Sequence, residues 1–276
     1  MSNYTAEDEK LINEAWEKLV ESCKKICKGE ESWNMIKRAY FLAKEAHQGV
    51  RRRSGEPYLI HPIAVAKIVV SNIGLGYKSI VAALLHDVVE DTDYTIDDIK
   101  NVFGPKIAQI VDGLTKIAGG IFGDKASAQA ENFKKLLLTM SDDIRVILIK
   151  IADRLHNMRT LEHMLPRKQY KIAGETLYLY APLAYRLGLN KIKSELEDLS
   201  FRFEHPKEYN AIKDKLAFSR EELNNAYKDF IAPVNNKLQQ MGIQYRIMGR
   251  IKTPYSIWRK MNARNLTFEE VYDILA

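Results

Sequence analysis

The sequence predicts a mainly all-α protein that ends in a short strand and a helix. Three observations predict this fold class. Apolar residues recur at helical spacing through residues 1–200. Capping boxes begin two of the periodic stretches, at Thr5 with Asp8 and at Thr95 with Asp98. Loops rich in glycine, serine or proline separate the stretches, most clearly in VRRRSGEPYLIHP.

The periodic segments predict a series of helices in chain order. The first runs from Thr5 to Cys27, and a second covers residues 32–47. Pro62 fits the first turn of a third helix that extends to Val70. Further helices are expected at 78–91, 95–103, 105–117, 127–140, 143–163 and 167–187, with a glycine-bearing loop at 119–127.

The carboxyl-terminal part of the chain has a different character. The segment IQYRIMGRIK alternates in the way a strand does, and TPYSIWRKMNARN then begins a helix. Between Gly242 and Phe268 there are six Lys or Arg residues and no acid. We therefore expect three parts: a helical domain at 1–200, a helical connector at 201–240 and the start of a second, basic module at 241–276.

Composition and charge exclude several classes of protein. The chain has 276 residues, of which 46% are hydrophobic and 28% charged, a balance typical of a soluble globular protein with a substantial core. No run approaches the roughly 18 apolar residues of a membrane span. The segment MSNYTAEDEK lacks the features of a signal peptide. We expect a cytoplasmic protein with no membrane contact. Its net charge of +6 suits phosphate-rich ligands, although generic excess lysine would look the same.

The two cysteines of the chain, Cys23 and Cys27, share one face of the first predicted helix. At this spacing they could hold a metal or form a redox pair. Apolar residues including Ile12 and Leu19 lie on the same face, so packing as small apolar side chains is the favoured interpretation.

The segment LLHDVVEDT, residues 84–92, places ionisable side chains in an aliphatic run. Burying charge costs several kcal/mol per ion unless a partner or a metal compensates it. In a helix, Glu90 and Asp91 would repeat the directions of His86 and Asp87 one turn later. A metal ion would resolve the burial problem, because it stabilises ionised carboxylates and neutral imidazoles.

Two ligands rarely hold a transition metal, so we expect others elsewhere in the chain. His61 is one candidate, and Asp153 is the other because its aliphatic neighbours predict burial. Two imidazoles and two carboxylates without thiolate suit Mn²⁺ with waters completing an octahedron, while zinc and iron stay open. Alone, each residue has an ordinary structural explanation. Structural or surface roles are assigned to the other histidines: His47, His156, His163 and His205.

These residues and their order resemble a known family. His61, then His86 with Asp87, then Asp153 look like the HD-domain phosphohydrolase superfamily. The segments RSGEPYLIHP, LLHDVVEDT, KIADRLHNMRTL, ETLYLYAPLAYRLG and GRIKTPYSIWRKM resemble the long RelA/SpoT homologues, bifunctional synthetase-hydrolases of the stringent response. The resemblance covers essentially the whole chain. It implies an HD-type helical fold and an Mn²⁺-dependent hydrolase that removes pyrophosphate from the 3′ position of ppGpp and pppGpp, leaving GDP or GTP.

The resemblance also implies roles for individual residues. The implied manganese ligands are His61, His86, Asp87 and Asp153. Glu90 and Asp91 match the family's catalytic acidic pair, and spacing does not say which of them handles the proton. The implied nucleotide contacts are Arg52, Arg53, Ser54, Asn157 and Thr160. Arg53 stands where many relatives carry lysine.

The chemistry of these residues agrees with nucleotide binding. Asp153, Asn157 and Thr160 are four and three residues apart, so they share a helix face. A guanidinium can stack on a base or pair with phosphate. Plain helix-surface polarity and a solvated basic loop would give the same pattern.

Two other functions stay open: another HD-type nucleotide phosphohydrolase, and a non-catalytic nucleotide sensor or nucleic-acid-binding module. The resemblance places a basic segment near ATP in the synthetase, namely Arg250, Lys252, Arg259 and Lys260. Pyrophosphoryl transfer also needs carboxylates that hold Mg²⁺, and the family's acidic motifs would lie beyond Ala276. We therefore expect no ppGpp synthesis and no nucleic-acid binding, and ribosome association only through regions beyond Ala276.

Overall fold

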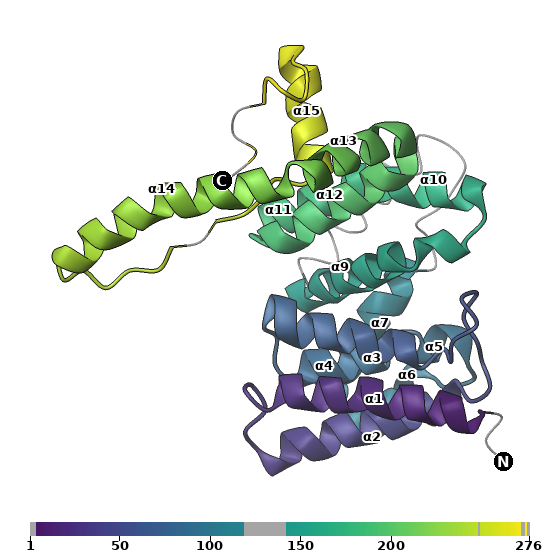
Figure 1. Cartoon of the computed structure of the whole chain (residues 1–276). Helices are drawn as coiled ribbons and strands as arrows, with labels where there is room; N and C mark the ends of the chain where they lie inside the picture. The colour runs from purple at the N-terminus through teal and green to yellow at the C-terminus, as the bar shows by residue number, and fades with distance from the viewer. Residues whose placement is uncertain (1–3, 119–141, 248, 272–273, 275–276) are drawn as a thin grey trace. The chain divides into compact units, whose positions relative to one another are not determined.

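This computed structural model describes residues 4–118, 142–247, 249–271 and 274, in which helices are joined by turns and loops (Figure 1). The chain divides into two compact units. The first comprises Met1–Lys168 and Leu183–Ile192, and the second comprises Gln169–Pro182 and Lys193–Ala276. The three-part division at 200 and 240 stays a prediction.

The helices of the amino-terminal part follow one another with short connections. They are α1 (Ala6–Cys23), α2 (Glu30–Ala46), α3 (Ile60–Ile68), α4 (Tyr77–Leu84), α5 (Val88–Asp91), α6 (Ile96–Phe103), α7 (Pro105–Ala118) and α9 (Ile144–Arg159). A π-helical turn, Val69–Ile73, continues α3, and a 3₁₀ turn, Leu161–His163, follows α9. α3 packs against α1, α4 and α9, which places it inside the bundle (Figure 1).

The later helices are α10 (Pro166–Glu175), α11 (Ala181–Arg186), α12 (Asn190–Glu204), α13 (Pro206–Phe218), α14 (Arg220–Gln240) and α15 (Pro254–Arg264). A π-helical turn, Thr176–Tyr180, joins α10 to α11, so the helix predicted at 167–187 is present in three pieces. The second unit has a core of its own, made by Phe201, Ile212, Ile257, Phe268 and Val271.

The predicted helix starts are confirmed at both capping boxes. Thr5 Oγ1 accepts from the backbone N–H of Asp8 at 3.2 Å, and the Asp8 carboxylate accepts from the backbone N–H of Thr5 at 2.8 Å. Thr95 and Asp98 repeat this exchange at the start of α6. Each box satisfies backbone donors that the first turn of a helix leaves without partners.

The prediction of one continuous helix at 78–91 is wrong. α4 ends at Leu84, a turn covers residues 85–87, and α5 resumes at Val88. The break has a local cause, because Nδ1 of His86 donates to the carbonyl oxygen of Ala83 at 2.8 Å. In an unbroken helix that carbonyl would accept from the backbone N–H of Asp87. The break turns His86 fully into the core.

The strand predicted in IQYRIMGRIK is also wrong, because residues 243–247 and 249–250 belong to no strand. A strand is stabilised by a neighbouring strand and by burial of one face. Ile243, Tyr245 and Ile251 are instead exposed, at 45%, 36% and 38%. The helix predicted after it is confirmed as α15, which Thr253 caps through the backbone N–H of Ser256. The loop predicted at 119–127 and the helix predicted at 127–140 lie outside the described residues.

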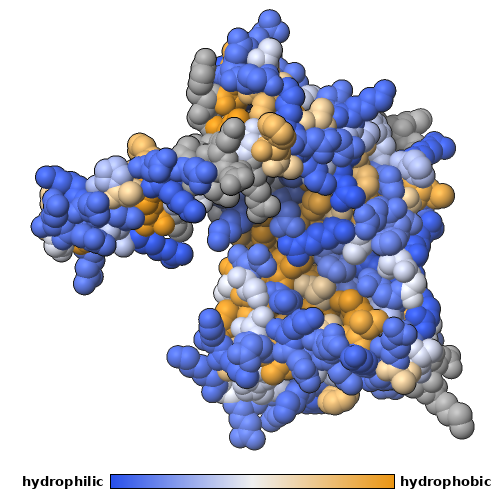
Figure 2. All heavy atoms as spheres, in the orientation of Figure 1, coloured by the Kyte–Doolittle hydropathy of each residue, from blue (hydrophilic) through white to orange (hydrophobic). Residues whose placement is uncertain are grey.

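The cysteines and the surface complete the fold. Cys23 and Cys27 are free and buried, and burial raises the pKa of the Cys23 thiol to about 12, which agrees with packing as apolar side chains. Hydrophilic residues cover much of the visible surface (Figure 2). Among the described helices, none has the length and apolarity needed to cross a membrane. The cellular location stays a prediction.

Candidate active site

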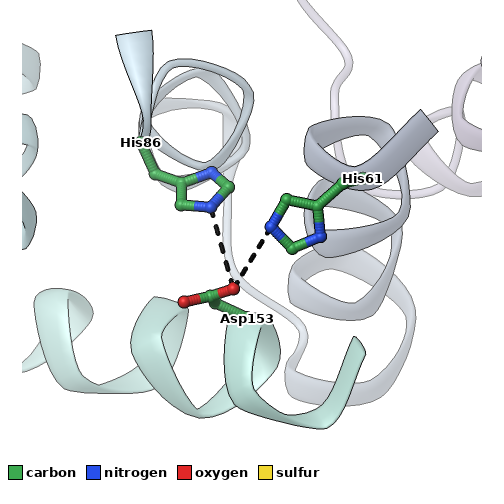
Figure 3. Close-up of side chains that lie close together, drawn as sticks. All are labelled: His61, His86 and Asp153. Atoms are coloured by element: carbon green, nitrogen blue, oxygen red, sulfur yellow. Dashed lines mark ion pairs between the residues drawn. The ribbon is translucent and has the colours of Figure 1, made fainter. Parts of the chain in front are cut away.

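Three side chains from separate parts of the chain meet inside the first unit (Figure 3). His61 comes from the first turn of α3, His86 from the turn between α4 and α5, and Asp153 from the middle of α9. One ligand atom of each lies within 4.8 Å of those of the other two. Asp153 Oδ1 is 3.2 Å from His61 Nε2 and 3.8 Å from His86 Nε2. These three residues form a metal-site candidate, although His61 and Asp153 are more than 90 positions apart in the sequence.

The imidazole of His86 presents a lone pair to this site. Its Nδ1–H is committed to the Ala83 carbonyl, so in the neutral ring Nε2 carries no hydrogen. Within the described part of the chain, buried Nε2 has no hydrogen-bond partner. It faces a carboxylate oxygen of Asp87 at 3.0 Å. Two lone pairs at this separation favour a cation between them, so the donor set fits a divalent metal.

Asp87 is the fourth predicted ligand, and it lies beside the three-residue cluster. Its Oδ2 is 3.6 Å from Nε2 of His61 and accepts a hydrogen bond from the Tyr58 hydroxyl at 2.6 Å. Tyr58 therefore holds the Asp87 carboxylate in place. Burial together with the charge of Asp87 raises the pKa of the Tyr58 hydroxyl, which keeps it a donor.

The electrostatics favour ionised carboxylates at this site. Burial alone would raise the pKa of Asp153, but the imidazole of His61 and the ammonium of Lys150 outweigh it and hold that pKa well below its usual value. Burial alone would also raise the pKa of Asp87, but the imidazole of His86 outweighs it and lowers that pKa. Burial lowers the pKa of His61, whereas at His86 the Asp87 carboxylate more than offsets burial and raises the pKa. The site thus carries two carboxylate anions, Asp87 and Asp153, whose charge favours binding of a cation.

The loop before α3 brings a guanidinium to the same region. An isolated bridge between Arg51 and Pro57 closes it, and Gly55 takes a positive φ of 89° at its tip. Arg51 points to α1, where it binds the Asp8 carboxylate at 2.5 Å. Arg52 points the other way, toward α9, with a side chain only 15% exposed.

Arg52 joins two of the predicted nucleotide contacts. Its Nη2 donates to Oδ1 of Asn157 at 3.0 Å and to Oγ1 of Thr160 at 3.2 Å. Asn157 in turn donates from Nδ2 to Oδ1 of Asp153 at 2.7 Å. The basic loop and the metal-site candidate therefore share one hydrogen-bonded network.

The remaining predicted site residues lie at its margin. Glu90 and Asp91, in α5, are exposed. Partial burial raises the pKa of the Glu90 carboxyl against the opposing charge of Lys150. Arg53 is exposed, and Ser54 is partly buried with its hydroxyl unpaired among the described residues. Their roles stay predictions.

Three neighbours of the site were missed from the sequence. Tyr58 contacts Asp87, Lys150 places its ammonium 3.7 Å from Asp153 Oδ2, and His156 contacts His61. Lys150 and His156 stand three residues before and after Asp153, on the face of α9 that carries the site. That spacing was the available signal. Tyr58 gave none, because its direction depends on the loop.

A helical bundle that brings together two imidazoles and two carboxylates from α3, α9 and the turn at 85–87 defines a class of protein. A family model described as HD domain matches residues 39–190, so the chain belongs to the HD-domain family.

Within that family, the resemblance to RelA/SpoT homologues is confirmed. The chain is 44% identical over 247 residues to the bifunctional (p)ppGpp synthase/hydrolase SpoT of Escherichia coli strain K12. It is 46% identical over 248 residues to a GTP pyrophosphokinase of Myxococcus xanthus. It is 44% identical over 241 residues to a guanosine-3′,5′-bis(diphosphate) 3′-pyrophosphohydrolase of Aquifex aeolicus.

These matches cover 90%, 88% and 87% of this chain but only 35%, 32% and 34% of the relatives, respectively. The chain thus spans about a third of the length of the relatives it matches. A solved structure described as a metazoan ortholog of SpoT that hydrolyses ppGpp is 24% identical, with a TM-score of 0.46, over 62% of this chain and 96% of that one.

Proposed function

We propose that this protein hydrolyses the 3′-pyrophosphate of ppGpp and pppGpp with Mn²⁺ as its metal, releasing pyrophosphate and GDP or GTP. The observation that carries the proposal is the sharing of Asp153 between two groups of side chains. It faces the imidazoles of His61 and His86, and it also accepts from Asn157, which Arg52 holds. A nucleotide bound by the second group would have its phosphates next to the first. Similar proteins named as 3′-pyrophosphohydrolases support this substrate.

The proposed metal ligands are the four side chains predicted from the sequence: His61, His86, Asp87 and Asp153. When bound, a divalent ion would polarise the attacked phosphoryl group and lower the pKa of a coordinated water. The chain's own part is to keep the two carboxylates ionised and the imidazole lone pairs directed inward. Tyr58 and the Ala83 carbonyl contribute by fixing Asp87 and His86.

Binding and orientation of the nucleotide fall to the loop and to α9. Arg52, Asn157 and Thr160 already contact one another, so little side-chain entropy remains to be lost when a ligand binds. We assign Arg53 and Ser54 to the neighbourhood of the guanine, as the family resemblance implies. The exposed position of Arg53 leaves its guanidinium free to approach a base or a phosphate.

Proton transfer is assigned to Glu90 and Asp91. In the overall reaction, water adds at the phosphorus joined to the 3′ oxygen, the bond between them breaks, and the 3′ oxygen leaves with a proton. A carboxyl whose pKa is raised exchanges protons more readily near neutral pH, which favours Glu90 for this task.

The test is a product assay with purified protein, Mn²⁺ and a panel of ppGpp, dGTP and a cyclic dinucleotide. We expect GDP and pyrophosphate from ppGpp and no turnover of the other two. His86→Ala should lose bound Mn²⁺ and turnover together, whereas Glu90→Gln should keep the metal and lose most of the rate. Turnover of dGTP alone would identify another HD-type phosphohydrolase, and binding of ppGpp without turnover would identify a sensor.

Two further points are proposed from sequence alone. We assign the hydrolase to residues 1–200, a connector to 201–240 and the start of a synthetase-like module to 241–276. We also propose a cytoplasmic location. Limited proteolysis with mass spectrometry tests the first, since cleavage should gather near the boundaries, and fluorescence microscopy of a tagged protein tests the second.

A further inference from the structure

His156 occupies a position that the proposed catalytic roles leave unexplained. It lies on α9 between Asp153 and Asn157, buried, and it touches both halves of the site. Its Nδ1 is 2.8 Å from Nδ1 of His61 and 3.2 Å from Nη1 of Arg52. The rings of His61 and His156 are 4.9 Å apart between centroids.

These contacts close a ring of polar interactions around the site. Its members are, in order, Asp153, Asn157, Arg52, His156 and His61. The distances between successive members are 2.7, 3.0, 3.2, 2.8 and 3.2 Å, and the last one returns to Asp153. Four of these contacts can be hydrogen bonds, and which atom donates in each depends on which groups have only donors or only acceptors.

The direction of each hydrogen bond in the ring follows from Arg52. A guanidinium has donors and no acceptor, so the Nδ1 of His156 that it faces must be a lone pair. The Nδ1 of His61 faces the same lone pair and must therefore carry a hydrogen. A neutral His61 with hydrogen on Nδ1 has its own lone pair on Nε2, the atom that faces Asp153 and Asp87.

We propose that His156 is a positioning residue that holds His61 in the tautomer able to bind the metal, and that Arg52 sets the polarity of this contact. The inference rests on the proposed metal role of His61 and deepens it. His156 is not a member of the His61, His86 and Asp153 cluster, and it acts through its contact with His61.

A purely structural role would make a different prediction. If His156 only filled space in the bundle, any ring of similar size would serve, and phenylalanine would replace it. If its Nδ1 lone pair matters, asparagine should replace it better, because Oδ1 of asparagine branches from Cγ as Nδ1 does and accepts hydrogen bonds. The two variants therefore separate packing from acceptance.

The experiment is calorimetric titration of the whole chain with Mn²⁺ alone, in the absence of nucleotide. We expect His156→Phe to bind Mn²⁺ about 10–100-fold more weakly than the unmodified protein, the usual range for losing a partner of a metal ligand. His156→Asn should stay within about threefold of the unmodified protein, well short of that range. His205→Phe is the matched control, because His205 contacts Phe201 and Trp258 in the second unit and should leave Mn²⁺ affinity unchanged.

Equal Mn²⁺ affinity in His156→Phe and the unmodified protein would overturn the proposal, and so would His156→Asn binding as weakly as His156→Phe. If His156→Phe does not fold, as judged by circular dichroism, His156→Ala takes its place in the same comparison. A protein that binds Mn²⁺ with the expected pattern but leaves ppGpp intact would refute the proposed function and support the tautomer argument. A protein that binds no divalent cation would refute both.

Discussion

Arg51 and Arg52 are neighbours in the loop at 51–57 but have different partners. Their partners indicate a structural role for the first and a ligand-binding role for the second. Arg51 binds the Asp8 carboxylate of α1 and the carbonyl of Gly55. Arg52 reaches Asn157 of α9 and Thr160, the residue that follows this helix. Successive side chains of this loop point in opposite directions, as expected beside the short antiparallel bridge. Of these two arginines, Arg52 is therefore the one positioned to hold a ligand beside the metal-site candidate.

Replacing Arg52 should weaken nucleotide binding more than metal binding. We expect Arg52→Ala to lower ppGpp affinity by about 1.5–3 kcal/mol, the usual worth of a hydrogen bond to a charged group. Calorimetry in a Glu90→Gln background, which slows turnover, measures this. Arg51→Ala is the matched control and should act mainly on thermal stability, through the lost Asp8 contact. If Arg52→Ala binds ppGpp as tightly as the unmodified protein does, Arg52 does not contact the nucleotide and is only a solvated charge.

At the scale of elements, α9 presents most of the site from one face. Lys150, Asp153, His156, Asn157 and Thr160 stand at spacings of three and four, so their side chains lie along one stripe. The start of α9 fixes where that stripe begins. Asp143 caps it by accepting from the backbone N–H of Arg145 at 3.1 Å. Its side chain, only 6% exposed, also pairs with the Lys106 ammonium at 3.0 Å and the Arg145 guanidinium at 2.6 Å.

The charge of Asp143 should stabilise the fold in a pH-dependent way. The hydrogen bonds of Arg145, against burial, hold the pKa of Asp143 well below its usual value. Because the pKa of the folded state is the lower one, the contribution is fully present above the unfolded value of about 4 and is lost as pH falls below it. Asp143→Asn should therefore cost about 1.5–3 kcal/mol at pH 7 and less at pH 3.5.

Urea denaturation at the two pH values measures this effect. Asp143→Ala should cost about 1 kcal/mol more than Asp143→Asn, because asparagine still caps the helix and alanine does not. The exposed pair Lys116 and Asp112 provides the control, and Asp112→Asn should have a much smaller effect. A cost for Asp143→Asn that does not depend on pH would contradict an electrostatic role.

At the scale of the whole molecule, the two compact units carry different tasks. Every predicted ligand and nucleotide contact belongs to the first unit, at residues 52–54, 61, 86–91 and 153–160. The described part of the second unit has a separate aromatic and aliphatic core, with Ile257 of α15 fully buried beside Phe201 and Phe268. Stability in one unit and metal affinity in the other should therefore respond to different substitutions.

Ile257→Ala should destabilise the second unit and leave Mn²⁺ affinity within about twofold. Truncating a fully buried isoleucine costs about 2–5 kcal/mol through lost burial and a residual cavity. Hydrogen exchange followed by mass spectrometry reports the loss in α12, α13 and α15, and calorimetry reports the metal. His61→Ala is the reciprocal variant, which should lose Mn²⁺ and leave exchange in α15 unchanged. A tenfold loss of Mn²⁺ affinity in Ile257→Ala would show that the units depend on one another.

Much of this molecule was predictable from local sequence. Helix periodicity and the capping residues Thr5, Thr95 and Thr253 act within a few positions, so they identified helices and several of their starts. Residue type is also visible in local sequence. Imidazoles and carboxylates among aliphatic neighbours indicate a metal site, and His61, His86 and Asp153 do meet in the structure.

The tertiary structure decided the directions of side chains and the continuity of elements. The turn at 85–87 depends on His86 taking the Ala83 carbonyl within a packed core, and residues 243–247 fail to form a strand because none of the described chain pairs with them. From sequence alone, His156 is an ordinary helix residue. In the structure, α3 and the loop at 51–57 bring His61 and Arg52 to its Nδ1. The sequence by itself determined which chemical groups and helices are present. Only packing between distant segments decided which atoms face each other, because hydrogen-bond direction depends on partners that local sequence does not contain.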